Sequence, residues 1–288
     1  MNRAKGIWFT ALAALLFGVN GAVAADLLRS VPPANTAQIR SVLAALVLGA
    51  LAYRRRATRH DGRLLQLALL GVVLAIVTVS FLVAIQRLGV GPGVTIQFTG
   101  PVLVLAWLRW VRHREVPRSA WLAAAAALLG VAMVSRFFEA EAMDPLGLAA
   151  ASVAAVTFAA YLLGSGQIGR HLPTLTVAAY GFGFSALLLL IVFPVRLPPT
   201  EGVVLAELAW LVVLGTVLPF LLEVEALQLA DAGTVGVVAT LEPVVAATVA
   251  WGWLGQTLTP WQVVGGLVVV GAVAVVQHFT GGEPTPIA

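Results

Sequence analysis

Apolar runs long enough to cross a lipid bilayer recur along the whole 288-residue chain, with short loops between them. An α-helix needs about 20 residues to cross the hydrocarbon core. Lipid cannot hydrogen-bond to the backbone, so a spanning segment must be a helix or part of a closed barrel. Runs of this length predict an all-α polytopic membrane protein with ten transmembrane helices. The predicted helices span residues 7–25, 35–53, 65–86, 92–111, 119–136, 146–164, 174–195, 206–227, 234–254 and 260–279.

The composition excludes a water-soluble domain. Hydrophobic residues make up 60% of the chain and charged residues 10%, whereas a soluble domain carries about 25% charged residues. The sequence pI of 10.3 would suit a nucleic-acid-binding protein. The basic residues, however, lie in short loops between apolar runs, as the positive-inside rule predicts. We therefore expect the lipid bilayer, and no nucleic acid, as a partner.

The distribution of Lys and Arg predicts both termini in the cytoplasm. With the N-terminus inside, twelve basic residues lie in inner segments and four in outer loops, and this bias fits the positive-inside rule. The inner residues are Arg3, Lys5, Arg54, Arg55, Arg56, Arg59, Arg63, Arg109, Arg112, Arg114, Arg118 and Arg170. The outer residues are Arg29, Arg87, Arg136 and Arg196.

An internal repeat divides the chain. Residues 84–111 align with residues 226–253 at a constant offset of 142, so that Pro101 meets Pro243. We predict a first repeat over 1–140, a second over 141–280 and a disordered tail over 281–288.

Five helices per repeat is an odd number, so the second copy must cross the membrane upside down relative to the first. Inverted repeats are typical of secondary transporters and place the binding site near the midplane, between the repeats. A duplicated bundle without a transport role is the alternative.

Charge is costly inside a span, and three of the charged residues inside predicted helices are candidates for the binding site. Glu242 precedes Pro243, which cannot donate a backbone hydrogen bond and so opens the helix. Glu223 lies one turn beyond Pro219, and Arg40 lies early in the second helix. Each could bind substrate. Alternatively, a Glu could cap or pair with a neighbouring helix, and Arg40 could extend to the membrane surface.

Neutral polar residues in the spans complete the predicted substrate-binding set. Polar groups at equivalent depth in both repeats would suit one shared cavity, although each alone could simply join two helices. The neutral candidates are Asn20, Gln97, Thr99, Tyr161 and Tyr180.

Glu242 and Glu223 are the candidates for coupling transport to protons. Apolar surroundings disfavour the charged form of a carboxyl, and Glu242 has apolar neighbours on both sides. We hypothesise that Glu242 carries the proton. Glu223 is expected to lie closer to water and to shape the cytoplasmic side.

Several segments resemble the drug/metabolite transporter superfamily, in the branch with EamA domains. They are Gln97–Pro101 (QFTGP), Leu218–Glu223 (LPFLLE), Thr240–Pro243 (TLEP) and Ser165–Gln167 (SGQ), the last expected just after the sixth helix. Within that branch the chain is most similar to the inner-membrane threonine and homoserine exporters. The resemblance implies ten helices in an inverted repeat and export of small metabolites across the inner membrane. Gln97 stands where those exporters carry an acid, which leaves substrate identity and ion coupling open.

We therefore predict a secondary active exporter of small metabolites, amino acids first, working by alternating access and coupled to protons if Glu242 titrates. An exporter of lipophilic cations or drugs is the first alternative, and a membrane scaffold or intramembrane enzyme is the second. An enzyme is not expected, because the sequence has no Walker-type loop, catalytic triad or His–Glu metal motif. The absence of Cys and the spacing of the four His predict no metal site and no cofactor. The exact substrate, the direction of transport and the oligomeric state stay open.

Overall fold

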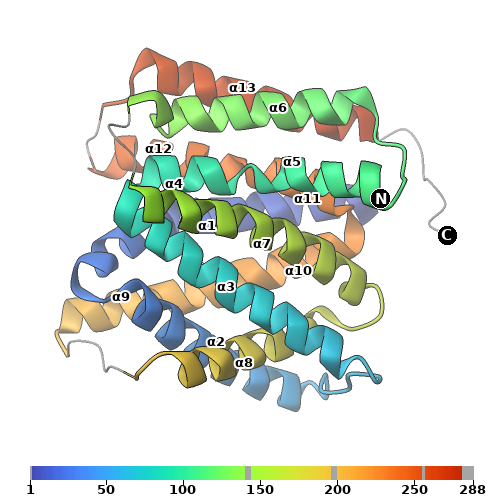
Figure 1. Cartoon of the computed structure of the whole chain (residues 1–288), viewed down its shortest axis with the longest axis vertical. Helices are drawn as coiled ribbons and strands as arrows, with labels where there is room; N and C mark the ends of the chain where they lie inside the picture. The colour runs from blue at the N-terminus through green and yellow to red at the C-terminus, as the bar shows by residue number, and fades with distance from the viewer. Residues whose placement is uncertain (1, 140–143, 196–199, 255–256, 281–288) are drawn as a thin grey trace.

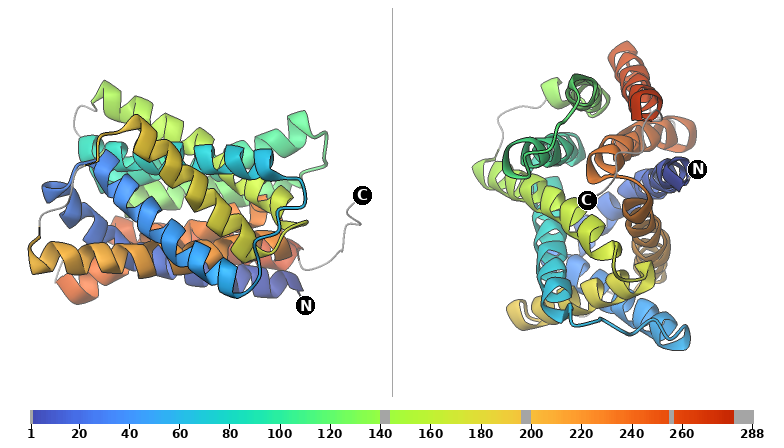
Figure 2. Two further views of the ribbon diagram at one scale, coloured as in Figure 1. Left: turned by 90° about the horizontal axis from the view of Figure 1, so that it is seen from below. Right: turned by 90° about the vertical axis from the view of Figure 1, so that its right-hand side faces the viewer.

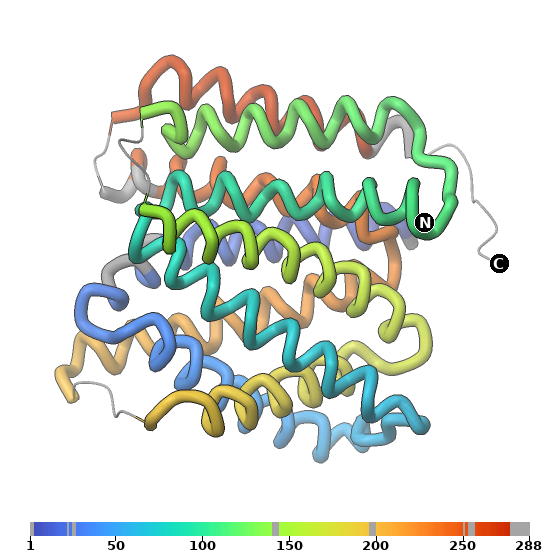
Figure 3. The backbone as a smooth tube through the Cα atoms, in the orientation of Figure 1, coloured from blue at the N-terminus to red at the C-terminus, as the bar shows by residue number. Residues whose placement is uncertain are grey.

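The computed structural model describes residues 2–139, 144–195, 200–254 and 257–280. Arg196 and the predicted tail 281–288 lie outside this part of the chain. The described residues form helices and no strand. The helices run side by side along one direction, and successive connections alternate between the two ends of the bundle (Figures 1 and 3).

The helices are numbered in chain order. Their bounds are α1 Asn2–Ser30, α2 Pro33–Arg54, α3 Leu64–Leu88, α4 Val90–Gln97, α5 Gly100–Ala106, η1 Trp107–Val111, α6 Arg118–Val134, η2 Phe137–Glu139, α7 Pro145–Gly169, α8 Thr174–Val192, α9 Gly202–Val212, η3 Val213–Val217, α10 Leu218–Leu229, α11 Ala232–Ala239, α12 Leu241–Leu254 and α13 Pro260–Thr280. Two of them, η1 and η3, are π-helical turns. The segment Ser165–Gln167, expected after the sixth helix, lies inside α7, because no proline interrupts the run between Pro145 and Pro173.

In the described part of the chain, eight helical segments are long and apolar enough to cross a membrane. They are Arg3–Gly21, Pro33–Arg54, Leu64–Leu88, Val90–Val111, Pro145–Gly169, Thr174–Val192, Gly202–Leu229 and Ala232–Val249. Two further apolar helices, Arg118–Val134 and Pro260–Val276, are shorter. The prediction of an all-α polytopic membrane protein is confirmed.

Two of the spans are broken in the middle, and a proline accounts for each break. Pro101 lies just inside α5 and Pro243 just inside α12, where neither can donate to the carbonyl four residues earlier. At each break a threonine hydroxyl donates a second hydrogen bond to a carbonyl that already accepts from the threonine's own backbone N–H. Thr99 donates to Ile96 O at 2.7 Å, and Thr240 donates to Val237 O at 2.6 Å.

Glycines allow the helices to approach closely. A Cβ at Gly130 on α6 would lie 2.7 Å from the carbonyl oxygen of Gly265, and one at Gly265 would lie 2.8 Å from that of Gly130. This contact joins α6 and α13 into a pair at one side of the bundle, while α2 and α8 pair at the opposite side. The right-hand view of Figure 2 shows both pairs end-on, with the remaining helices between them.

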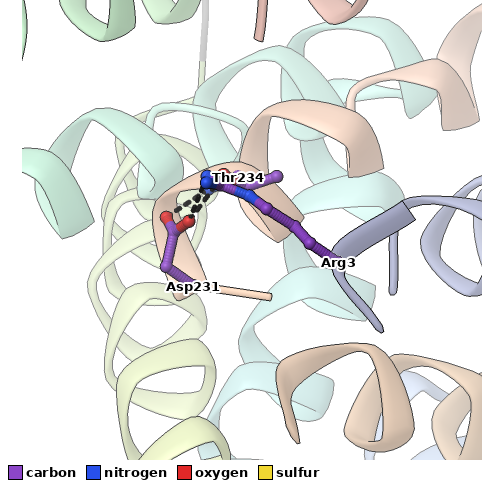
Figure 4. Close-up of polar contacts among 3 residues, drawn as sticks. All are labelled: Arg3, Asp231 and Thr234. Carbon is purple, nitrogen blue, oxygen red and sulfur yellow. Dashed lines mark hydrogen bonds and ion pairs between the residues drawn. The ribbon is translucent and has the colours of Figure 1, made fainter. Parts of the chain in front are cut away.

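Ion pairs lie at both ends of the bundle. At the end where α1 begins, called here the N-terminal end, Arg3 donates to Asp231 at 2.8 Å and to Thr234 at 2.9 Å (Figure 4). At the far end, Arg87 donates to Asp144 at 3.1 Å. The backbone N–H of Leu146, assisted by Arg87, lowers the pKa of the Asp144 carboxyl. Both aspartates also cap helices, Asp144 at α7 and Asp231 at α11.

Candidate substrate-binding site

A cavity of about 760 Å³ lies at the centre of the bundle, between helices from both halves of the chain. It continues to the far end, where its lining includes Arg29 in the last turn of α1, Val90 in the first turn of α4 and Gln262 near the start of α13. Thr10 is the lining residue nearest the start of α1. The cavity therefore opens toward the end opposite the Arg3–Asp231 ion pair.

The three charged residues singled out in the spans all line this cavity. Arg40 comes from α2, Glu223 from α10 and Glu242 from the first turn of α12. Arg40 and Glu242 are close enough for their charges to interact, and so are Glu223 and Glu242. No direct ion pair joins Arg40 to either carboxylate in the described part of the chain. These charges are therefore free to bind a ligand.

A cluster of aromatic rings holds Arg40 in place. The guanidinium carbon lies 5.4 Å from the centre of the Phe220 ring, a cation–π distance. Phe220 in turn makes edge-to-face contacts with Phe17 at 5.3 Å, Tyr161 at 5.8 Å and Phe182 at 5.1 Å. The Arg40 Nε atom is buried without a hydrogen-bond partner among the described residues. Packing rather than pairing thus positions this cation.

Of the five neutral candidates, Asn20, Gln97 and Tyr161 line the cavity. The side-chain oxygens of Asn20 and Gln97 are buried without a hydrogen-bond partner in the described structure. Buried polar groups normally find such partners. Unpaired amides in a cavity wall are suited to bind a polar ligand.

Thr99 and Tyr180 lie away from the cavity lining. The Thr99 hydroxyl is engaged by Ile96 O at the break between α4 and α5. The Tyr180 hydroxyl donates to Thr58 O at 2.9 Å, in the connection between α2 and α3. Both polar groups therefore have structural partners, which the sequence could not reveal.

The expectation that Glu223 lies closer to water than Glu242 is wrong. Glu223 is only 4% exposed, whereas Glu242 is partly exposed and faces the cavity. Glu223 lies on α10, the helix that directly follows the π-helical turn η3. The helix α10 packs against α1, α7 and α8, so Glu223 is enclosed by neighbouring helices.

The N-terminal end is closed by direct helix contacts. A Cβ at Gly6 on α1 would lie 3.1 Å from the side chains of Leu229 and Ala230, so α1 meets the end of α10 with no intervening space. Thr174 donates a hydrogen bond to Glu225, and Gln228 donates to Leu172 O at 3.2 Å. Together with the ion pair in Figure 4, these contacts separate the cavity from this end.

Two residues that shape the site were not singled out for it. Phe220 belongs to the LPFLLE segment, and its place one residue after Pro219 could have marked it. Gly215 lies in the π-helical turn η3, which carries no proline or other sequence signal that we can identify. No group of three His, Cys, Asp or Glu side chains in the described ranges could hold a metal ion.

A bundle of apolar spans around a central cavity lined by apolar, charged and amide side chains fits a multi-pass membrane transporter with a small-molecule substrate. The sequence profile of the EamA-like transporter family matches residues 4–136 and again residues 145–277. The chain belongs to the EamA-like transporter family, and it is a transporter rather than an enzyme.

Curated relatives include an amino acid exporter. The chain is 27% identical over 235 residues to the threonine/homoserine exporter RhtA of Escherichia coli strain K12, covering 78% of this chain and 75% of that protein. RhtA of the E. coli strains O6:H1 and O157:H7 matches equally.

A solved crystal structure also shares the fold. It superposes with a TM-score of 0.78 over 94% of this chain and 96% of the other, at 17% sequence identity. At that identity the likeness concerns the fold alone.

Proposed function

We propose that this protein is a secondary active exporter in the inner membrane that moves small amino acids out of the cytoplasm by alternating access. The observation that carries the proposal is the charge pattern of the cavity. Arg40 can bind a carboxylate, while Glu242 and Glu223 can bind an ammonium group, and all three line one space. A free amino acid presents both groups. The similarity to a threonine/homoserine exporter supports the same substrate class.

We further propose that ten helices form two inverted repeats, residues 1–140 and 141–280. If each of the first five spans is exchanged with its counterpart among the last five, the contacts between helices map onto one another. The contact between α3 and α7 corresponds to that between α10 and α1, and the pairs α2–α8 and α6–α13 each correspond to themselves. The two segments matched by the family profile support the same division.

The Arg and Lys distribution supports a cytoplasmic N-terminal end, so the structure would represent a state open to the outside. The chain has no Cys, and single cysteines therefore report topology without background. Cysteine at His60, between α2 and α3, should be protected from a membrane-impermeant maleimide in intact cells. Cysteine at Phe138, which is 70% exposed in η2, should be labelled. Equal labelling at both positions would contradict the ten-span arrangement.

Proton coupling is the third part of the proposal. A charged carboxyl without a partner is costly away from water, so Glu242 can release substrate and bind a proton in its place. Exchange of one proton for one substrate would then drive export.

A lipophilic cation exporter is the second candidate, because Phe17, Phe81, Phe158 and Phe220 line the same cavity as the two carboxylates. One experiment separates the candidates. Purified protein in proteoliposomes is tested for uptake of labelled amino acids and of tetraphenylphosphonium, with and without a pH gradient. Gradient-dependent uptake of an amino acid supports the proposal. Preference for the cation over every amino acid would replace it with the second candidate.

A further inference from the structure

Asn20 occupies an unusual place in the cavity wall. It lies on α1 facing the π-helical turn η3, and its side chain is only 5% exposed. Its amide oxygen nevertheless has no hydrogen-bond partner in the described part of the chain. Leaving a buried amide unpaired is unfavourable. A hydrogen-bond partner that the substrate supplies when it binds would account for the unpaired oxygen.

The space for this side chain depends on Gly215. A Cβ at position 215 would lie 2.2 Å from Asn20 Nδ2, 2.3 Å from Cγ and 2.5 Å from Oδ1. These are side-chain atoms at the end of a rotatable chain, so a methyl group there would push the amide aside rather than displace the α1 backbone. Any residue other than glycine at 215 would therefore move Asn20.

The π-helical turn brings Gly215 to this position. In the next residue, Thr216, the hydroxyl donates to Leu211 O at 2.8 Å, five residues back, at the wider turn. Such turns are rare and are frequent at functional sites. Here the turn precedes α10, which carries Phe220 and Glu223 into the same cavity.

We propose that Gly215 is a positioning residue for Asn20, and that the Asn20 amide binds a hydroxyl group on the side chain of the substrate. This rests on the proposed amino acid export. Arg40 and Glu242 serve the charged groups of such a substrate, which leaves Asn20 for a neutral one. An amide both donates and accepts hydrogen bonds, and so does a hydroxyl.

Gln97 is the competing residue, because its amide oxygen is also unpaired and it also lines the cavity. It lies on α4, and the atoms nearest a Cβ at position 215 all belong to Asn20. Substitutions at residue 215 should therefore act on Asn20 and not on Gln97, which distinguishes the roles of the two amides. The inference assigns the hydroxyl to Asn20.

Competition between threonine and valine tests the assignment, because valine replaces the hydroxyl with a methyl group. Threonine should compete for uptake into proteoliposomes at least about tenfold better than valine in the wild type, since a site built to bind a hydroxyl rejects the analogue without it. Asn20→Leu and Gly215→Ala should each reduce this preference to about twofold or less. Gly183→Ala, at a glycine of α8 with nothing within 4 Å of its Cβ position, should keep the wild-type ratio. Loss of the preference in Gln97→Leu but not in Asn20→Leu would overturn the assignment.

Thermal unfolding tests the spatial claim without any transport. Gly215→Ala should lower the Tm of the purified protein when Asn20 is present, and lower it less when Asn20→Ala has emptied the space. An equal decrease in both backgrounds would show that the two residues do not compete for space. If the wild type transports no amino acid, the proposed function and the hydroxyl assignment both fail, while the Tm comparison still decides the pairing of Gly215 with Asn20.

Discussion

The two broken helices of the bundle are built alike but carry different chemistry. In both, a threonine hydroxyl donates to a carbonyl at the break and a proline follows. The residue directly before the proline is Gly100 in α5 and Glu242 in α12. The break itself is therefore a feature of both halves, whereas only the second half places a carboxylate there.

The neighbouring helices explain how the second break accommodates a larger residue. At the first break the small residue lies on the broken helix, since a Cβ at Gly100 would lie 2.9 Å from the Phe158 ring on α7. At the second break the small residue lies on the partner helix, since a Cβ at Gly18 on α1 would lie 2.6 Å from Glu242 O. Moving the glycine to the neighbour leaves position 242 free for a side chain that lines the cavity.

The largest effect on uptake is expected from removing the charge of Glu242, which only the second break carries. Glu242→Gln keeps the volume and removes the titrating group. It should abolish uptake driven by a pH gradient in proteoliposomes, while substrate exchange at equal pH stays partly intact. If this variant accumulates substrate normally across a gradient, the carboxyl is structural and the proton-carrier role is wrong.

The contact between Gly18 on α1 and the second break should be the next most sensitive to substitution. Gly18→Ala places a methyl group against backbone, which cannot rotate away, so α1 and α12 must separate. We expect overpacking to cost about 1–3 kcal/mol, seen as a lower Tm and a several-fold loss of uptake. Gly49→Ala on α2 is the control, since nothing lies within 4 Å of its Cβ position. Equal effects of the two substitutions would contradict the role given to Gly18.

Glu223 should behave differently from Glu242, although both line the cavity. Because Glu223 is enclosed by helices, we expect Glu223→Gln to weaken uptake but to preserve its dependence on the pH gradient. The measurement is the ratio of initial rates with and without the gradient. A ratio that falls to one in this variant would transfer the coupling role from Glu242 to Glu223.

The smallest effects are expected from removing the threonine hydrogen bonds that both breaks contain. Thr99→Val and Thr240→Val each remove one hydroxyl–carbonyl hydrogen bond, worth about 1 kcal/mol. We expect small and similar decreases in Tm for both, and for Thr99→Val an unchanged KM, because Thr99 lies outside the cavity lining. A large increase in KM for Thr99→Val would restore its predicted role in substrate binding.

Much of the architecture could be predicted because membrane insertion imposes simple rules. The length of the apolar runs predicted the polytopic helical fold, and Pro243 predicted an opening in its helix. Charge inside a span is costly, which directed attention to Arg40, Glu223 and Glu242, and all three line the cavity. Whether they bind substrate stays a prediction.

The details that failed depend on tertiary contacts. Tyr180 lies within a span, but its hydroxyl reaches Thr58 O in a connection that the sequence does not place. The burial of Glu223 follows from the packing of α10 against three other helices. The role of Gly215 depends on a π-helical turn, which shifts every following side chain around the helix and leaves no periodic pattern of its own.

The central claim is that one cavity binds both charged groups of an amino acid, the carboxylate at Arg40 and the ammonium at Glu242. Head-group analogues of the best substrate test it directly, by competition for uptake in proteoliposomes. The wild type should discriminate at least about tenfold, or about 1.4 kcal/mol, against both the amide, which lacks the carboxylate, and the hydroxy acid, which lacks the ammonium group. Arg40→Gln should lose discrimination against the amide alone, and Glu242→Gln against the hydroxy acid alone. A wild-type protein that accepts both analogues as readily as the amino acid would contradict the claim.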